Sequence, residues 1–221
     1  MINSINFKIN KFMNNKQIQI RTETVEKRFG KTLLFKNINI HLKIGDSFYI
    51  TGPNGSGKST LLQILAGIQR PSSGKIIYSV NDAIISNDLY KDYLGFTGPQ
   101  VNPYDMLTAS ENLKFMYPES VDDNKISALL EKFDLYRHKD KIIKHFSSGM
   151  KQRLKLIHAL VRDPEILMLD EPCSNLDASG RDIVYQTLGE IKAGKILIIA
   201  TNESEEINLC TKGIDLEQNN K

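Results

Sequence analysis

The sequence of 221 residues has no tryptophan, only two cysteines and no long apolar run. Cys173 and Cys210 form no C-x-x-C pair, and the four histidines lack the spacing of metal ligands. A disulfide framework and a structural zinc site are therefore excluded, and we expect a reducing, cytoplasmic environment. The longest apolar runs, at 166–169 and 196–200, fall far short of the roughly 18 residues that cross a bilayer. We expect no membrane segment, and the N-terminus has no apolar core typical of a signal peptide.

An excess of one charge is also missing. The chain has 29 Lys and Arg residues against 26 Asp and Glu, and the basic residues are scattered among carboxylates. No nucleic acid partner is therefore expected. With 40% hydrophobic and 25% charged residues, the composition is that of an ordinary globular protein. The length allows one core, with or without an inserted subdomain, so we expect a single domain.

The N-terminal half shows strand patterns followed by a phosphate-loop pattern. Residues 1–16 are rich in Asn and Lys and are expected to form a flexible extension, with Met13 as an alternative start. The domain proper is expected at 17–218. Its first part has strand-like runs, a glycine-rich turn, a helical run at 58–68 and a further strand that closes a small antiparallel sheet. The strand-like runs lie at 17–25, 33–42, 47–51 and 75–80.

The C-terminal half is helical at first and then alternates strands with helices. Residues 87–163 are interpreted as an inserted helical subdomain, with helical runs at 108–116, 123–133 and 148–162. Short apolar strands at 165–169 and 195–200, with a helix at 179–193 between them, are typical of a buried parallel sheet. A last strand is expected at 213–216. The predicted fold class is α/β, with a parallel sheet, an N-terminal antiparallel β subdomain and the helical insertion.

A glycine-rich loop lies between the strand at 47–51 and the following helix. It fits G-x-x-x-x-G-K-[ST], in which backbone N–H groups surround phosphate oxygens at a helix N-terminus. Lys58 would reach the outer phosphates and Ser59 would bind Mg²⁺. A glycine turn that only joins a strand to a helix is the alternative. The predicted nucleotide-binding residues are Gly52, Pro53, Asn54, Gly55, Ser56, Gly57, Lys58, Ser59 and Thr60.

Two carboxylates follow the apolar strand at 165–169. Asp170 can hold Mg²⁺ through water, and Glu171 can polarise the water that attacks the γ-phosphate. Because ligands bind at the carboxyl ends of parallel strands, both side chains are expected at the nucleotide site. Two solvated charges at a strand end are the alternative.

The segment 146–153, F-S-S-G-M-K-Q-R, narrows the choice among phosphate-loop proteins. It resembles the signature of ABC transporter ATP-binding subunits, and similarity to that family extends from Gln19 to Leu216. The resemblance implies a P-loop NTPase core. It also implies that Ser147 and Gly149 complete the nucleotide site of a partner subunit. The signature departs from the commoner family pattern at Phe146, Ser148 and Met150, and this variant is similar to the signatures of some exporter-type and haem-export-type subunits.

The resemblance carries over to three further positions. Asp177, in S-N-L-D, matches the D-loop that crosses the dimer interface, although it can also cap the next helix. Phe29 lies where the family places an aromatic ring on adenine, and a core residue is the alternative. Gln100 resembles the Q-loop glutamine that contacts Mg²⁺ and the attacking water, and an exposed turn glutamine is the alternative.

Asn202 is a departure from the family, which usually has a histidine at this place. An asparagine amide can donate a hydrogen bond to a phosphate oxygen, but it carries no positive charge. We expect Asn202 to be a weaker switch contact in a site that still hydrolyses ATP through Glu171. The alternative is a capping pair with Glu205 for the helix that follows. Cys173, beside the catalytic strand end, is expected to be a packing residue.

The resemblance predicts an ATPase that uses ATP and Mg²⁺ to power transport through a separate membrane permease. The chain would pair with a second copy or a similar ATPase subunit and would sit on the cytoplasmic face of the cell membrane. Because the chain ends soon after its last strand, without the added C-terminal regulatory domain of some importer subunits, we expect export rather than import. The alternatives are a non-transport ABC ATPase and a hydrolysis-poor, ATP-gated binding module. A small-molecule P-loop kinase has no use for the signature and the D-loop.

Overall fold

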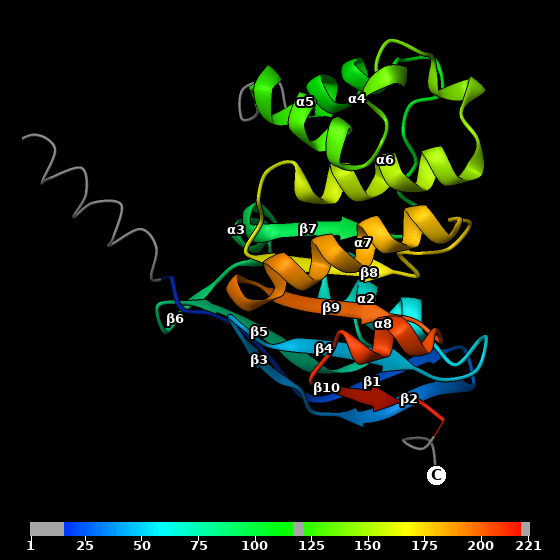
Figure 1. The fold of residues 1–221 in the computed structure, drawn as a ribbon. Coiled ribbons are helices and arrows are strands. Elements are labelled where there is room, and N and C mark those ends of the chain that lie inside the picture. The colour runs from blue at the N-terminus through cyan, green and yellow to red at the C-terminus, as the bar shows by residue number, and fades with distance from the viewer. Residues whose placement is uncertain (1–15, 117–121, 218–221) are drawn as a thin grey trace, which may run out of the picture.

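The structure is a computed structural model that describes residues 16–116 and 122–217. The extension predicted at 1–16 lies outside these residues except for Lys16, and Met13 lies outside them as well. The described chain forms an antiparallel β layer, a parallel sheet with helices on both faces, and a helical layer, as Figure 1 shows. This is the predicted α/β architecture.

The centre of the fold is a parallel sheet with the strand order β10-β4-β9-β8-β7. Its β8 and β9 are buried on both faces, which explains their continuous apolar sequences. The strands are β4 (Ser47–Thr51), β7 (Leu94–Thr97), β8 (Ile166–Asp170), β9 (Ile196–Ala200) and β10 (Lys212–Asp215).

The antiparallel layer is built around the long strand β1, which pairs with β2, β3 and β5. The strand expected at 33–42 is two strands, because the Thr22 hydroxyl interrupts the ladder: it donates to Ile38 O at 3.0 Å and accepts from Ile40 N at 2.8 Å. The strands of this layer are β1 (Ile18–Phe29), β2 (Thr32–Ile38), β3 (His41–Lys43), β5 (Ser73–Val80) and β6 (Ala83–Ile85).

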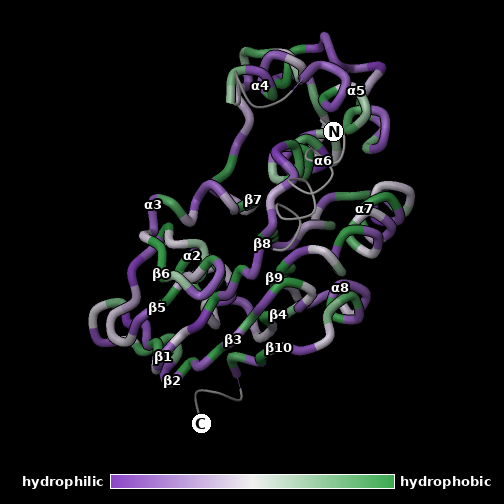
Figure 2. The backbone as a smooth tube through the Cα atoms, turned by 90° about the vertical axis from the view of Figure 1, so that its left-hand side faces the viewer, coloured by the Kyte–Doolittle hydropathy of each residue, from purple (hydrophilic) through white to green (hydrophobic). Residues whose placement is uncertain are grey.

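The period-two alternation of the parallel strands separates two hydrophobic cores. In β8, Ile166 and Met168 pack toward α2 (Lys58–Leu65) and the antiparallel layer, whereas Leu167 and Leu169 pack toward the helices on the other face. Figure 2 shows hydrophobic segments both in the sheet strands and in the helices that pack against them. The two cores fix α2 on one face of the sheet and α6 and α7 on the other.

The helices lie mainly after β7. The region 87–163 is not helical throughout, because β7 within it pairs with β8 in the central sheet. This strand has only four residues and contains Gly95, where a Cβ would overlap the carbonyl group of Ala159 in α6. The helices are α3 (Asn87–Tyr90), α4 (Ala109–Met116), α5 (Asp123–Lys132), α6 (Ser148–Leu160), α7 (Ala178–Ile191) and α8 (Ser204–Asn208). Single 3₁₀ turns lie at Lys91–Tyr93, Tyr136–His138, Ile143–His145 and Lys192–Gly194.

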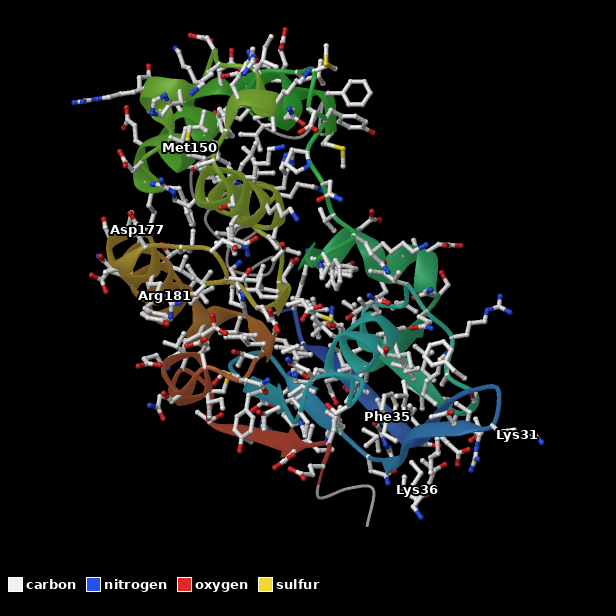
Figure 3. The ribbon with its side chains drawn as sticks, turned by 90° about the vertical axis from the view of Figure 1, so that its right-hand side faces the viewer. Lys31, Phe35, Lys36, Met150, Asp177 and Arg181 are labelled. Carbon is white, nitrogen blue, oxygen red and sulfur yellow. The ribbon has the colours of Figure 1, made fainter. Side chains whose placement is uncertain are left out.

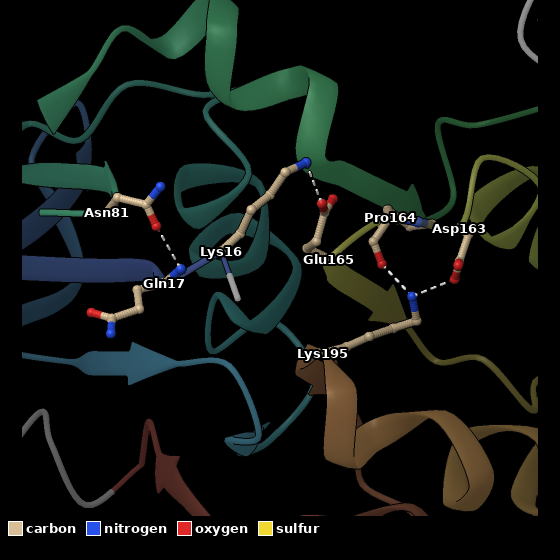
Figure 4. Close-up of polar contacts among 7 residues, drawn as sticks. All are labelled: Lys16, Gln17, Asn81, Asp163, Pro164, Glu165 and Lys195. Atoms are coloured by element: carbon tan, nitrogen blue, oxygen red, sulfur yellow. Dashed lines mark hydrogen bonds and ion pairs between the residues drawn. The ribbon is translucent and has the colours of Figure 1, made fainter. Parts of the chain in front are cut away.

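Polar contacts hold the amino ends of β8 and β9 together, as Figure 4 shows. The Lys195 ammonium donates to Asp163 Oδ1 at 2.6 Å and to Pro164 O at 2.5 Å. Lys16 pairs with Glu165 at 2.8 Å, which ties the start of β1 to the same edge. These contacts lie at the amino ends of the strands and do not involve the carboxyl ends, where the candidate site lies.

Candidate nucleotide site

The phosphate loop joins β4 to α2 at the carboxyl end of the sheet. Gly52, Gly55 and Gly57 adopt φ values of 142°, 83° and 101°, which residues with a Cβ rarely adopt. Gly57 is the N-cap of α2 and provides no side-chain cap, so the first N–H groups of the helix point into the loop. Lys58 is 6% exposed, and its ammonium donates to Gly52 O at 2.8 Å and to Pro53 O at 3.3 Å. These features fit the anion cradle that the motif predicts.

A cavity of about 360 Å³ opens above the phosphate loop. Phe29 lies on its rim and is 53% exposed, so the alternative of a core phenylalanine is wrong. The Lys27 ammonium lies 4.9 Å from the centre of the Phe29 ring. Glu171 reaches the same cavity from the end of β8. The loop residues that line it are Asn54, Gly55, Gly57, Lys58, Ser59 and Thr60.

The two carboxylates after β8 have different environments. Asp170 is 6% exposed, and burial raises its pKa, an effect that a hydrogen bond from Ser59 partly offsets. Within the described residues, Asp170 Oδ2 has no hydrogen-bond partner. Glu171 is exposed and adopts a φ of 46°, and its N–H donates to Ala200 O at 2.9 Å. A non-glycine residue in this strained region at a ligand cavity is typical of a functional position.

The oxygens of Ser59 and Asp170 fit a magnesium site. Mg²⁺ prefers hard oxygen ligands and is commonly held by one or two protein oxygens together with water and substrate phosphates. The unpartnered Oδ2 of Asp170 is a buried acceptor at the place where such an ion would lie.

A second cavity, of about 320 Å³, adjoins the first and shares Ser59 and Glu171 with it. Gln152 from α6 lines this cavity, and its Nε2 donates to Glu171 O at 3.2 Å and to Pro172 O at 3.0 Å. No sequence pattern singles out Gln152, although it lies inside the signature segment. Gln100 lies two residues after Gly98, which lines the second cavity. Gln100 itself is exposed and lines neither cavity. Its predicted contact with Mg²⁺ and water stays a prediction.

Asn202 follows β9 and contacts the phosphate loop. When its amide is oriented so that both ends have partners, Nδ2 donates to Gly52 O at 2.8 Å and Oδ1 accepts from Lys58 Nζ at 3.1 Å. The alternative of a helix cap is wrong, because the N-cap of α8 is Glu203 and Glu205 lies inside the helix. Asn202 therefore joins β9 to the two groups that would bind phosphate.

The signature and the D-loop lie together, away from the phosphate loop. Ser147 caps α6 by accepting from Met150 N at 3.2 Å, and Asp177 caps α7 by accepting from Gly180 N at 2.9 Å. A Cβ on Gly149 would lie 3.0 Å from Asn175 O, so the two segments are in contact. Figure 3 shows Met150 and Asp177 on one side, and Phe35, below the phosphate loop, on the other. Ser147, Gly149 and Asp177 do not line either nucleotide cavity.

Cys173 is buried behind the end of β8. Its N–H donates to Glu206 Oε1 at 2.9 Å, and Glu206 is itself 1% exposed. Burial raises the pKa of the Cys173 thiol and of the Glu206 carboxyl. The thiol is therefore kept protonated, as expected of a packing residue.

Comparison with known proteins decides the family. The model of the family described as "ABC transporter" matches residues 35–174. The chain belongs to the ABC transporter family. It is 32% identical to a probable sulfate/thiosulfate import ATP-binding protein of Chlorella vulgaris, covering 92% of this chain and 89% of that protein. It is 34% identical to a linearmycin resistance ATP-binding protein of Bacillus subtilis, covering 87% of this chain and 64% of that protein.

Solved structures of ABC cassettes have the same fold. The dimer of a bacterial ABC transporter cassette matches with a TM-score of 0.75 at 26% identity, covering 89% of this chain and 94% of that one. An ATP-binding cassette dimer in a post-hydrolysis state with ADP and Pi matches with a TM-score of 0.77 at 25% identity, covering 89% and 93%. The phosphate loop, the strand carboxylates and the signature thus belong to an ABC cassette.

Proposed function

We propose that this ABC cassette binds and hydrolyses ATP to power transport through a separate membrane permease. One observation supports this most directly. Glu171, at the end of β8, lines both cavities, and the first of these cavities opens on the phosphate loop. A base and an anion cradle at one site are the parts that phosphoryl transfer to water needs.

Different residues of the site would bind the phosphates, the base and Mg²⁺. The N–H groups of the loop and the Lys58 ammonium neutralise the phosphate oxygens, and the exposed ring of Phe29 stacks on the base. Ser59, Asp170 and Gln100 would hold Mg²⁺, which supplies charge neutralisation at the outer phosphates when it is bound.

Hydrolysis is assigned to Glu171. Its carboxylate orients a water molecule in line with the bond to the γ-phosphate and accepts its proton as the bond breaks. The hydrogen bonds from Gln152 to Glu171 O and Pro172 O restrain the backbone that carries this carboxylate. Asn202 keeps the β9 end in contact with Lys58 and Gly52, and it contributes a neutral donor where a histidine could contribute charge.

The second half of the site comes from another subunit in this proposal. Ser147, Gly149 and Asp177 do not line this chain's nucleotide cavities, so they are free to close over the nucleotide of a second copy or a similar ATPase. Nucleotide binding would close the dimer and hydrolysis would reopen it.

A permease completes the proposed transporter. Among the described residues, no helix combines the length and apolarity that spanning a bilayer requires. Large apolar side chains are exposed around α4, which offers a contact surface for a cytoplasmic segment of the permease: Tyr104, Met106, Phe115 and Met116. We accordingly place the chain at the inner face of the cell membrane.

The test is Mg²⁺-dependent phosphate release from ATP by the chain, alone and with its copurified membrane partner. Glu171→Gln should abolish release and retain ATP binding. Glu131→Gln, which changes an exposed carboxylate on α5, is the matched control and should behave as the unmodified chain does. If the unmodified chain binds ATP and releases no phosphate even with its permease, it is an ATP-gated binding module instead.

A further inference from the structure

One cation at the nucleotide site has no role in the proposed mechanism. Lys155 lies on α6 and lines the second cavity together with Ser59, Asp170 and Glu171. It is the one Lys or Arg among the described residues that line this cavity. Gln152 lies three positions earlier on the same helix face and fixes that face against the loop after β8.

The ammonium of Lys155 is unpaired, unlike its neighbour one turn earlier. Lys151 forms an ion pair with Asp105 at 2.7 Å, whereas Lys155 makes no hydrogen bond or ion pair within the described part of the chain. Lys155 is half-buried, and partial burial and then repulsion from Lys151 lower its pKa. A partly buried cation without a counter-charge favours the arrival of an anion.

The charges around the cavity indicate which anion would fit. Asp170 and Glu171 place two carboxylates on the wall, and the ammonium of Lys58 is directed to the carbonyl groups of the phosphate loop. A triphosphate that extends from the first cavity would bring its last phosphate to the boundary, where Ser59 and Glu171 line both cavities. A cation on the α6 side would offset the repulsion between this phosphate and the carboxylates.

We propose that Lys155 is a further residue of the ATP site, and that its ammonium contacts the γ-phosphate oxygens from α6. It supplies positive charge that the neutral amide of Asn202 cannot supply. The inference rests on the proposed function, since it takes ATP as the ligand. Lys155 acts on the terminal phosphate and not on the α- and β-phosphates, so it distinguishes ATP from ADP.

The test compares the affinities of ATP and ADP, each with Mg²⁺, by isothermal titration calorimetry. All variants carry Glu171→Gln, so that turnover does not disturb the titration. Adding Lys155→Met should weaken ATP binding by about tenfold or more, because a charge-assisted hydrogen bond is lost, and should leave ADP binding unchanged. Lys155→Arg should keep the ATP preference. Lys132→Met, which removes a surface lysine paired with Glu190, is the matched control and should match its parent for both nucleotides.

Two results would overturn the inference. Unchanged ATP affinity in Lys155→Met excludes a contact with the γ-phosphate, and equal losses for ATP and ADP indicate a structural role for Lys155. The proposed function fails on a different observation, namely the absence of phosphate release from the chain that retains Glu171. The ratio of ATP to ADP affinity reports on Lys155 in either case.

Discussion

Replacing Gln152 with leucine tests how the chain after β8, which carries Glu171, is held in place. Gln152 is 8% exposed, and its amide nitrogen donates to Glu171 O and Pro172 O, at 3.2 Å and 3.0 Å. Leucine has a similar size and favours a helix, so the change removes the two hydrogen bonds and leaves α6 otherwise intact. The two carbonyl groups then lose their donor in a partly buried place.

The expected loss of stability is about 2 to 3 kcal/mol. Each hydrogen bond contributes a net of about 0.5 to 1.5 kcal/mol, and a buried carbonyl group left without a donor costs further free energy. The apolar surface that leucine buries offsets part of this loss. Turnover should fall at least about tenfold, because Glu171 must be held close to its productive position, and a shift of about 1 Å can cost a hundredfold.

Urea unfolding followed by circular dichroism measures the free energy of unfolding, and phosphate release measures turnover. Gln186→Leu is the matched control, because Gln186 is exposed and binds Glu190 at 3.0 Å on the surface of α7. It should change the free energy of unfolding by less than about 0.5 kcal/mol. If Gln152→Leu were as stable and as active as this control, the argument that Gln152 holds Glu171 would be refuted.

Three further predictions follow from the contacts described. Phe29→Ala should weaken ATP binding by roughly three- to tenfold with little change in the urea midpoint, since the exposed ring loses its contact with the base and a surface contact with the Lys27 ammonium; unchanged affinity would contradict the stacking role. Asn202→His should raise the rate of phosphate release, because an imidazole can carry charge where the amide cannot, and an unaltered rate would contradict this. Burial lowers the pKa of His158 to about 4 from 6.5, so the unfolded chain binds this proton more readily than the folded chain and stability is lost as the pH falls through that interval. Between these pH values the free energy of unfolding of the unmodified chain should fall by about 1.4 kcal/mol per pH unit more than that of His158→Leu, and equal slopes in urea titrations would refute the assignment.

The elements with strong local signals could be predicted from the sequence. The apolar runs of β8 and β9 indicated buried parallel strands, and the glycine-rich loop indicated the turn before α2, because both depend on local composition. The four-residue strand β7 could not be predicted in the same way. It contains Gly95, which weakens a strand signal, and it is held by pairing with β8 and by the close approach of α6.

The candidate site shows the same division. The sequence was enough to name Lys58 and Ser59, which belong to the phosphate-loop motif. It was also enough to name Asp170 and Glu171, which lie at the end of an apolar strand. The contacts of Gln152 and Asn202 could not be predicted, because both join segments that are distant in the sequence. For Asn202 the sequence left both a switch contact and a helix cap open, and the phosphate loop provides partners that the local pattern does not show.

The sequence by itself thus determined the family, the phosphate loop and the paired carboxylates, since these depend on residue types at short, fixed spacings. Only the tertiary structure decided which side chains meet across the carboxyl end of the sheet. Gln152 and Lys155 reach the site because α6 packs on β7. Gln152 is also hydrogen-bonded to the loop after β8. Such contacts arise from the packing of whole elements, and no local pattern of hydrophobicity or charge specifies them.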